Sequence, residues 1–413
     1  MVAAAVTLIG EQAMVTISLS DLEALAVGLI AIVAATACFR RVPILARLNL
    51  PIPVVAGIMV ALVADLLHRF GGMSIEFAAG LRDFFLLVFF TTIGLSAKFS
   101  ALKAGGRPLV ILCAVTVILL VVQNVVGVLV ALVYGAHPFY GVLIGSVSFV
   151  GGPGTAAAWA KEAQAMGLVH APEIAVGAAT LAVVVGALVS GPVTGWLVRS
   201  RNLRGPTGES PANWVLPEVP NPLPAPPIAT IMQVLLLIVI AVLAGAAAND
   251  WARAAGFVMP GFLTAMLAGA AITNLGDMLG AKFDFSPIER CGEIALQAFL
   301  VMYLMSLKLW ILGAAIGPLL ANVAVQLLVT VLVGVLLLFR WLGRDYDAAV
   351  TVGGFLGFGL SSMPVAMATM DSVASRYGPS PKAFLLIALA GSFFVDLANA
   401  LIVKAFFLLP WFH

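Results

Sequence analysis

The stretch Gly145-Ser-Val-Ser-Phe-Val-Gly-Gly-Pro-Gly-Thr155 interrupts an otherwise apolar segment of the chain. Each glycine disfavours a helix by about 0.8 to 1 kcal/mol relative to alanine, so a straight membrane helix is not expected here. A similar stretch, Thr351-Val-Gly-Gly-Phe-Leu-Gly-Phe-Gly-Leu-Ser361, stands 206 positions further along. The sequence therefore predicts two broken helical segments in corresponding places, and the rest of the fold is organised around them.

The composition around these stretches is that of an integral membrane protein. Of the 413 residues, 62% are apolar and 10% are charged, against roughly 45 to 50% and 25% in soluble domains. Many runs reach the roughly 20 apolar residues that cross a hydrocarbon core of about 30 Å. Membrane lipid is therefore an expected partner. Nucleic acid is not expected as a partner, because the lysines and arginines lie in short loops and form no long basic tail. The three cysteines form no CxxC motif, so no metal or redox cofactor is expected.

The apolar runs predict five full spans on each side of a proline-rich linker. The expected divisions are an N-terminal extension (1–20), a first half (21–199), a linker (200–227) and a second half (228–413). The expected spans are residues 22–39, 52–67, 84–102, 109–134 and 174–198, then 228–248, 259–275, 294–312, 316–339 and 384–409. The broken segments, 139–166 and 346–373, precede the last span of each half.

The two halves also match residue by residue. Pro53 matches Pro260, Phe149 matches Phe355 and Gly151 matches Gly357, with offsets of 206 or 207. An odd number of spans in each half places the second half upside down relative to the first, which is an inverted-topology repeat. The predicted fold is therefore an all-α integral membrane protein with two inverted-topology repeats, each of five transmembrane helices and one re-entrant loop, or ten transmembrane helices in total.

Loop charges predict how the chain is oriented in the membrane. With Met1 outside, fifteen lysines and arginines fall in cytoplasmic loops and five fall outside, as the positive-inside rule requires. Both termini are then expected outside and the central linker in the cytoplasm. The first broken segment enters from outside and the second from the cytoplasm.

Broken backbone at membrane depth is tolerated where protein buries it or where it lines a watery cavity. Two such breaks entering from opposite faces are expected to meet near the midplane, where helix N-termini suit a carboxylate and oxygen donors suit sodium. The alternative is that the glycines only permit close helix packing. The candidate substrate-binding residues are Ser148, Gly151, Gly152, Gly154 and Thr155 in the first tip, and Gly357, Gly359, Ser361 and Ser362 in the second.

A second polar signal lies in the last span. Ser392, Asp396 and Asn399 are spaced i, i+4 and i+7, so they share one helical face. A charge at the centre of a membrane helix costs about 2.5 to 3.5 kcal/mol, so Asp396 is expected to face a cavity and a cation. These three residues are the predicted sodium site. The alternative is that Asp396 pairs with Lys404 or bonds to a neighbouring helix.

The amides Gln123, Asn124 and Gln326 also lie within predicted spans. Such side chains form hydrogen bonds between membrane helices. That interpretation is favoured over contact with the substrate, and both stay open at this point.

These features indicate a secondary active transporter with alternating access, and not an enzyme. The sequence has no HExxH and no GxSxG motif, and Tyr346-Asp347 has no GxGD partner to complete an intramembrane aspartyl dyad. A passive channel remains an alternative, because re-entrant loops also form selectivity filters.

Specific motifs add a family resemblance. Four segments resemble the bacterial glutamate:sodium symporters: the first tip with the Ala157-Ala158-Trp159 that follows it, residues 345–350, Gly357-Phe358-Gly359-Leu360 and residues 393–404. The likeness extends from about Leu22 over nearly the whole chain. The resemblance implies sodium-coupled uptake of an acidic amino acid, glutamate first of all, by an elevator-type movement. It also implies sodium as the coupling ion, no other cofactor, a homodimer and the bacterial inner membrane.

Two departures from the family pattern bear on the substrate. Pro153 stands where the glutamate carriers have a histidine, and Ser361-Ser362-Met363 stands where they have small residues followed by threonine. A sodium- or proton-coupled carrier of another small carboxylate, such as a dicarboxylate or citrate, is therefore the alternative within the same class.

Overall fold

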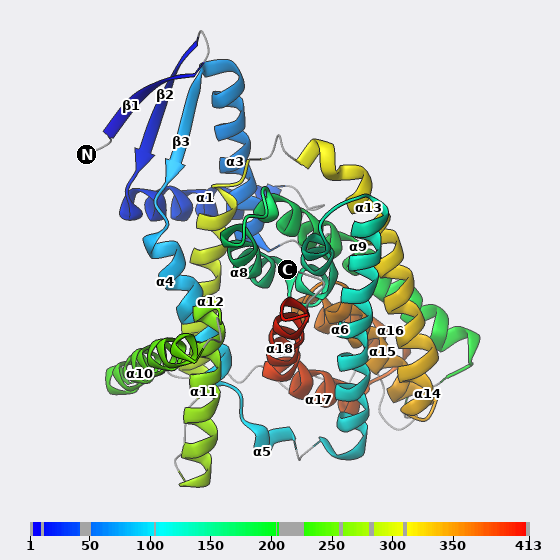
Figure 1. Ribbon diagram of the computed structural model, residues 1–413. Coiled ribbons are helices and arrows are strands. Elements are labelled where there is room, and N and C mark those ends of the chain that lie inside the picture. The colour runs from blue at the N-terminus through cyan, green and yellow to red at the C-terminus, as the bar shows by residue number, and fades with distance from the viewer. Residues whose placement is uncertain are drawn as a thin grey trace.

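The computed structural model describes residues 3–9, 12–41, 51–102, 105–203, 205, 227–255, 259–280, 285–308 and 312–409. It is built mainly of helices (Figure 1). Residues 206–226, which make up most of the predicted linker, lie outside the described residues.

The helices follow most of the predicted spans, but the spans predicted at 84–102 and 294–312 are displaced, because the helices there are Gly80–Leu95 and Phe285–Leu304. In the first half they are α1 (Asp21–Arg41), α3 (Ile52–Gly71), α4 (Gly80–Leu95), α5 (Phe99–Leu102), α6 (Gly106–Val133), α7 (Pro138–Val142), the π-helical η2 (Leu143–Val147), α8 (Gly152–Ala165) and α9 (Ala171–Ser200). In the second half they are α10 (Ile228–Ala254), α11 (Gly261–Met278), α12 (Phe285–Leu304), α13 (Leu312–Leu332), the π-helical η5 (Val333–Leu338), α14 (Phe339–Trp341), α15 (Tyr346–Leu360), α16 (Met363–Tyr377), α17 (Pro381–Leu389), the π-helical η6 (Ala390–Phe394) and α18 (Val395–Phe407).

Six helices among the described residues are long and apolar enough to cross a membrane. They are α1, α3, α6, α9, α10 and the continuous stretch Ile316–Trp341. This confirms a membrane-embedded, helical protein with several spans. The remaining predicted spans correspond to α4, α11, α12 and the continuous α17–η6–α18 stretch.

Three strands correct the prediction of an all-α chain. β1 (Ala3–Ile9) pairs antiparallel with β2 (Gln12–Leu19), and β2 pairs parallel with β3 (Met73–Phe77). Residues Val15 to Leu19 alternate apolar and hydroxyl side chains, which is the period-two pattern of a strand. The predicted N-terminal extension is therefore held against the segment that joins α3 to α4.

The helices form two bundles that stand side by side in Figure 1. The support bundle consists of α1, α3, α4, α10, α11 and α12, in which α4 packs against α11 and α12. This packing is close, because a Cβ on Gly94 of α4 would lie 2.0 Å from the carbonyl oxygen of Met266 in α11. The tip bundle consists of α6 to α9 and α13 to α18, in which α9 packs against α8, α15 and α16. Each bundle thus takes helices from both halves of the chain.

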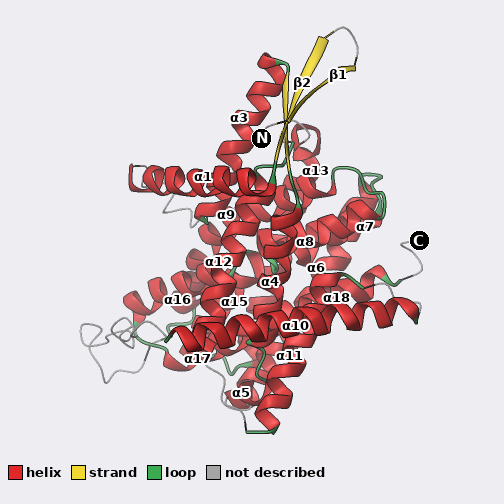
Figure 2. Ribbon diagram, turned by 90° about the vertical axis from the view of Figure 1, so that its left-hand side faces the viewer, coloured by secondary structure: helices red, strands yellow, loops and turns green. Residues whose placement is uncertain are grey.

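The first helix of each half has a similar place in the support bundle. In Figure 2, α1 and α10 run across the picture, whereas α3 and α11, which follow them, run steeply. α1 packs against α3, and α10 packs against α11. α1 also packs against α12, and α10 against α4, so the first helices of the two halves have corresponding neighbours.

Candidate functional site

The first broken segment is a helical hairpin with a glycine tip. Its two arms are α7 with η2, and α8, and each is too short to span a bilayer. The backbone leaves the helical conformation at Gly145, with φ −93° and ψ −132°. Gly152 begins α8 with a φ of +66°, a left-handed conformation that glycine adopts readily. The predicted break is confirmed at these residues.

The second broken segment has the same form. Its arms are α15 and α16, and the helix is interrupted at Ser361 and Ser362. Ser361 has φ −156° and ψ −82°, and Ser362 is extended. The two serines therefore form the tip of the second hairpin.

Matching tyrosines close the base of each hairpin. The hydroxyl of Tyr140 donates to the carbonyl oxygen of Val169, and the hydroxyl of Tyr346 donates to that of Gly378. In each case the tyrosine lies at the start of the entering arm and its acceptor just beyond the returning arm. The two hairpins thus share a tyrosine hydrogen bond at the base as well as a helix break at the tip.

Buried amides of α6 support the broken backbone of both hairpins. The Nε2 of Gln123 donates to the carbonyl oxygen of Gly359 over 2.8 Å and to Oγ1 of Thr330 over 3.0 Å. The Oδ1 of Asn124 accepts from the backbone N–H of Ser146 over 3.0 Å. Because irregular backbone at membrane depth needs such partners, these bonds give the two α6 amides a supporting role.

α13 supplies a second pair of amides. The Nδ2 of Asn322 donates to the carbonyl oxygen of Ile144 over 2.7 Å, and the Nε2 of Gln326 donates to that of Gln123 over 2.8 Å. Both side chains are fully buried. The hydrogen-bonding interpretation of Gln123, Asn124 and Gln326 is thus the one that their geometry favours. Asn322, Thr330 and Ser146 were not singled out from the sequence.

Both tips reach one cavity of about 640 Å³ between the two bundles. From the tip bundle it is lined by Gly151, Ser361 and Ser362, together with Asp396 in α18. The opposite wall comes from the support bundle, including Thr92 and Ser96 of α4 and Glu289 and Glu293 of α12. Residues far apart in the sequence therefore meet around one space that is large enough for an amino acid.

The tips also contact each other. A Cβ added to Gly152 would lie 3.3 Å from the carbonyl oxygen of Ser361. Beneath them, a Cβ on Gly186 of α9 would lie 2.8 Å from the Cβ of Ser361. The glycines at the tip therefore allow the backbones of the two hairpins to approach closely.

Asp396 is half-buried at the edge of this cavity. No hydrogen bond or ion pair joins its carboxylate to any other residue that the structure describes. The pairing with Lys404 that the sequence left open is thus not observed. A hard carboxylate oxygen that faces a cavity without a protein partner fits the chemistry of a sodium ligand.

The other predicted sodium ligands have different surroundings. Asn399 is fully buried and pairs with Ser146, whose Oγ donates to the Oδ1 of Asn399 over 2.7 Å. The Nδ2 of Asn399 donates to the carbonyl oxygen of Ser146 over 3.2 Å. Ser392 lies in η6, but its side chain is outside the described part of the structure. Of the three predicted sodium ligands, Asp396 lines the cavity.

Several predicted substrate ligands do not line the cavity. Ser148 Oγ is 2.6 Å from the carbonyl oxygen of Leu143 and 2.8 Å from that of Ala175. Gly357 packs against α16, Gly359 accepts the bond from Gln123, and Gly154 faces Leu296 of α12. Thr155 is buried next to Gly151. Gly151, Ser361 and Ser362 line the cavity, and the part of the others in binding stays a prediction.

An apolar cluster borders the cavity and joins the two bundles. Trp159 of α8 stands edge-to-face with Phe262 of α11, with ring centroids 5.3 Å apart. Phe90 and Phe299 belong to the same cluster, and the cavity-lining Phe89 packs against it. The space between the bundles is therefore interrupted by packed side chains.

A family model described as sodium/glutamate symporter matches residues 17–379. The chain belongs to the sodium/glutamate symporter family. A sodium/glutamate symporter of Haemophilus influenzae is 35% identical over 396 residues, covering 94% of this chain and 97% of that protein. A sodium/glutamate symporter of Escherichia coli strain K12 is 36% identical over 380 residues, covering 90% of this chain and 94% of its own.

Membership of this family confirms the resemblance to the bacterial glutamate:sodium symporters that the sequence motifs indicated. It identifies the chain as a membrane carrier and not an enzyme. The match includes both hairpins and ends before α17, whereas the similarity to the two relatives covers nearly the whole chain. Sodium and glutamate are the ligands that this family's name implies for the chain.

Proposed function

We propose that this protein takes up glutamate by symport with sodium, through the cavity between the two hairpin tips. Family membership supports the class of transport and the coupling ion. The location of the binding site is proposed from one observation: the cavity is lined by Gly151, Ser361, Ser362 and Asp396. Each comes from a segment that the sequence had singled out on physical grounds.

In this proposal the substrate carboxylates bind at the hairpin tips. α8 begins at Gly152 and α16 begins at Met363, so the N-termini of two helices lie at the tips. Helix N-termini carry about half a positive charge and free N–H groups, which favour a carboxylate. Sodium binds at Asp396, where its charge offsets that of the aspartate.

The proposed architecture is two inverted repeats with ten spans, residues 21–199 and 228–413. Three features support it: the corresponding hydrogen bonds of Tyr140 and Tyr346, the corresponding neighbours of α1 and α10, and the contribution of both halves to each bundle. Alternating access then takes the elevator form, in which the tip bundle slides along the support bundle. The position of the cavity at the boundary between the bundles supports this movement.

The loop charges support an orientation with both termini outside and the linker in the cytoplasm. In that orientation the tip cavity lies toward the cytoplasmic ends of α4 and α12, and the apolar cluster lies on its outer side. A homodimer in the bacterial inner membrane completes the proposal, on the strength of the family resemblance.

Sodium-driven uptake in proteoliposomes tests the function. An inward sodium gradient is expected to accumulate labelled L-glutamate, and dissipating that gradient should abolish the accumulation. If two sodium ions accompany each monoanionic substrate, an inside-negative potential adds about 2.3 kcal/mol per 100 mV for the net charge moved. Uptake that follows a proton gradient without sodium, or that takes citrate or a dicarboxylate in preference to glutamate, would overturn the proposal.

A further inference from the structure

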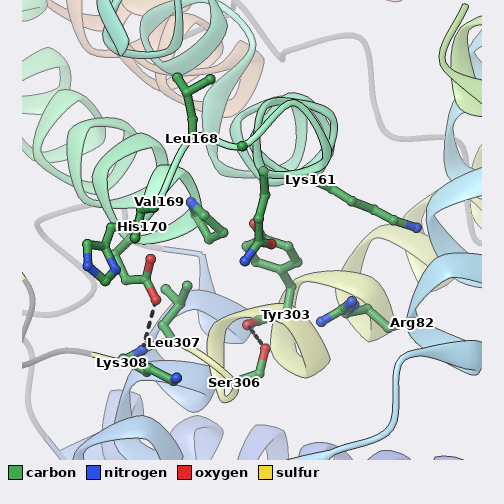
Figure 3. A pocket seen from close by; sticks show the side chains of 13 residues that line it. Arg82, Lys161, Leu168, Val169, His170, Tyr303, Ser306, Leu307 and Lys308 are labelled. Carbon is green, nitrogen blue, oxygen red and sulfur yellow. Dashed lines mark hydrogen bonds between the residues drawn. The ribbon is translucent and has the colours of Figure 1, made fainter. Parts of the chain in front are cut away.

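A second cavity, of about 480 Å³, lies between the same two bundles. Its walls are Arg82 at the start of α4, Tyr303 at the end of α12 and residues 306–308 just beyond it, Lys161 and Gln164 of α8, and residues 167–170, 172 and 173, which lead into α9 (Figure 3). We refer to this space as the basic chamber. It lies at the opposite ends of α4 and α12 from the tip cavity.

Positive side chains outnumber acids around the basic chamber. Arg82, Lys161 and Lys308 line it, together with one acid, Glu173. Asp83, just behind the wall, lies 2.6 Å from Nζ of Lys161 and 3.5 Å from Nε of Arg82. Among the described residues, the three lining cations are thus met by two carboxylates, Glu173 in the lining and Asp83 next to it, which leaves one positive charge in excess.

That excess charge is located at Lys308. Its side chain is exposed, and its ammonium has no carboxylate partner among the described residues. Only its backbone N–H approaches Glu173, with 3.5 Å between N and Oε1. The ammonium is therefore available to a ligand in the chamber.

Tyr303 provides an independent sign that the chamber accepts a polar ligand. This side chain is 95% buried, and its hydroxyl has no hydrogen-bond partner among the described residues. It stands at the centre of the lining, beside Arg82, whose guanidinium lies 5.4 Å from the centre of its ring (Figure 3). Because a buried hydroxyl without a partner costs free energy, a ligand oxygen that accepts from it would stabilise the structure.

The two cavities are separated by the apolar cluster described above. Leu168, Tyr303 and Leu307 belong to that cluster and line the basic chamber, whereas Phe89 and Leu296 pack against it and line the tip cavity. The charges on the two sides are opposite, since the support-bundle wall of the tip cavity carries Glu289 and Glu293. An anion is thus favoured at the chamber end of the bundle boundary.

We propose that the basic chamber is an entry site that binds the acidic amino acid before it reaches the hairpin tips. A substrate with two carboxylates and one ammonium, and a net charge of −1, matches a chamber with one excess positive charge. One carboxylate binds Lys308, the other accepts from Tyr303 near Arg82, and the ammonium faces Glu173. This inference rests on the proposed function, because the identity of the substrate and the position of the chamber on the outer side both come from that proposal.

Replacing Lys308 with a neutral residue tests the entry site through the kinetics of uptake. In Lys308→Gln, the KM for external L-glutamate should rise at least fivefold while the maximal rate stays within twofold of the unchanged protein. The matched control is Arg253→Gln, which removes an exposed cation of α10 that does not line the chamber. An unchanged KM in Lys308→Gln, or an equal rise in both variants, would overturn the inference.

Thiol labelling tests binding in the chamber without relying on transport. Val169→Cys places a thiol at an exposed lining position, in a protein whose native Cys38, Cys113 and Cys291 are replaced by alanine. An anionic methanethiosulfonate should label it faster than a cationic one, and L-glutamate should slow the labelling at least threefold. The protection should persist in Asp396→Asn and disappear in Lys308→Gln. Protection without sodium-driven uptake would sustain the entry site and refute the proposed function, whereas uptake without protection would do the reverse.

Discussion

Replacing Asp396 with asparagine is expected to lower sodium-driven glutamate uptake at least a hundredfold. The carboxylate faces the tip cavity and has no partner among the described residues, so sodium is its counter-charge in this account. Truncating one partner of a desolvated charge pair costs about 2 to 5 kcal/mol of binding free energy, and each 1.4 kcal/mol is a factor of about ten in affinity. Initial uptake rates measured over a range of sodium concentrations give the size of the loss.

The control for this variant is Asp371→Asn. Asp371 is an exposed aspartate on α16, in the same bundle, and it does not line the tip cavity. Its uptake should stay close to that of the unchanged protein. If Asp396→Asn kept a normal sodium dependence, Asp396 would have no part in coupling.

Gly152→Ala is expected to reduce uptake about tenfold. Gly152 has a φ of +66°, where a side chain costs roughly 1 kcal/mol or more. Its new Cβ would also lie 3.3 Å from the carbonyl oxygen of Ser361, which is closer than an ordinary contact. Because that oxygen belongs to the opposite tip, the two hairpins must separate slightly, and both sides of the substrate site shift. The measurement is the initial rate together with the KM for glutamate.

Gly135→Ala separates the contact between the tips from the backbone strain. Gly135 has a φ of +70°, and an added Cβ there has no atom within 4 Å. Both variants therefore pay a similar conformational cost, but only Gly152→Ala disturbs the opposite hairpin. Equal losses in the two variants would mean that the close approach of the tips has no special part in transport.

The breaks and Asp396 could be predicted because each violates a strong rule for membrane helices. Glycine clusters disfavour a helix, and an aspartate deep in a span needs a cation or a cavity. The repeat and the loop charges then predicted that the two tips approach each other, and the structure brings Gly151, Ser361 and Ser362 to one cavity. The individual ligands could not be separated in this way, since Ser148 and Thr155 have the same composition signal but do not line the cavity.

The partners of the buried amides could not be predicted from spacing. An asparagine such as Asn322 in an apolar helix signals a need for hydrogen bonds, but its acceptor, the carbonyl oxygen of Ile144, is 178 positions away. The basic chamber was missed for the same reason, because Arg82 and Lys308 lie in different halves and meet only when α4 packs against α12. The strand at residues 12–19 could not be predicted for another reason: its period-two pattern covers only Val15 to Leu19, and it forms by pairing with residues 3–9 and with residues 73–77.

The position of bound substrate tests the central claim most directly. A cryo-EM map of the protein with saturating L-glutamate and sodium, compared with a map without them, should show new density in the tip cavity. The account predicts this density between Gly151 and the Ser361–Ser362 tip, with a sodium-sized feature at the carboxylate of Asp396. Density confined to any other place, with the space between the two tips unchanged, would contradict it.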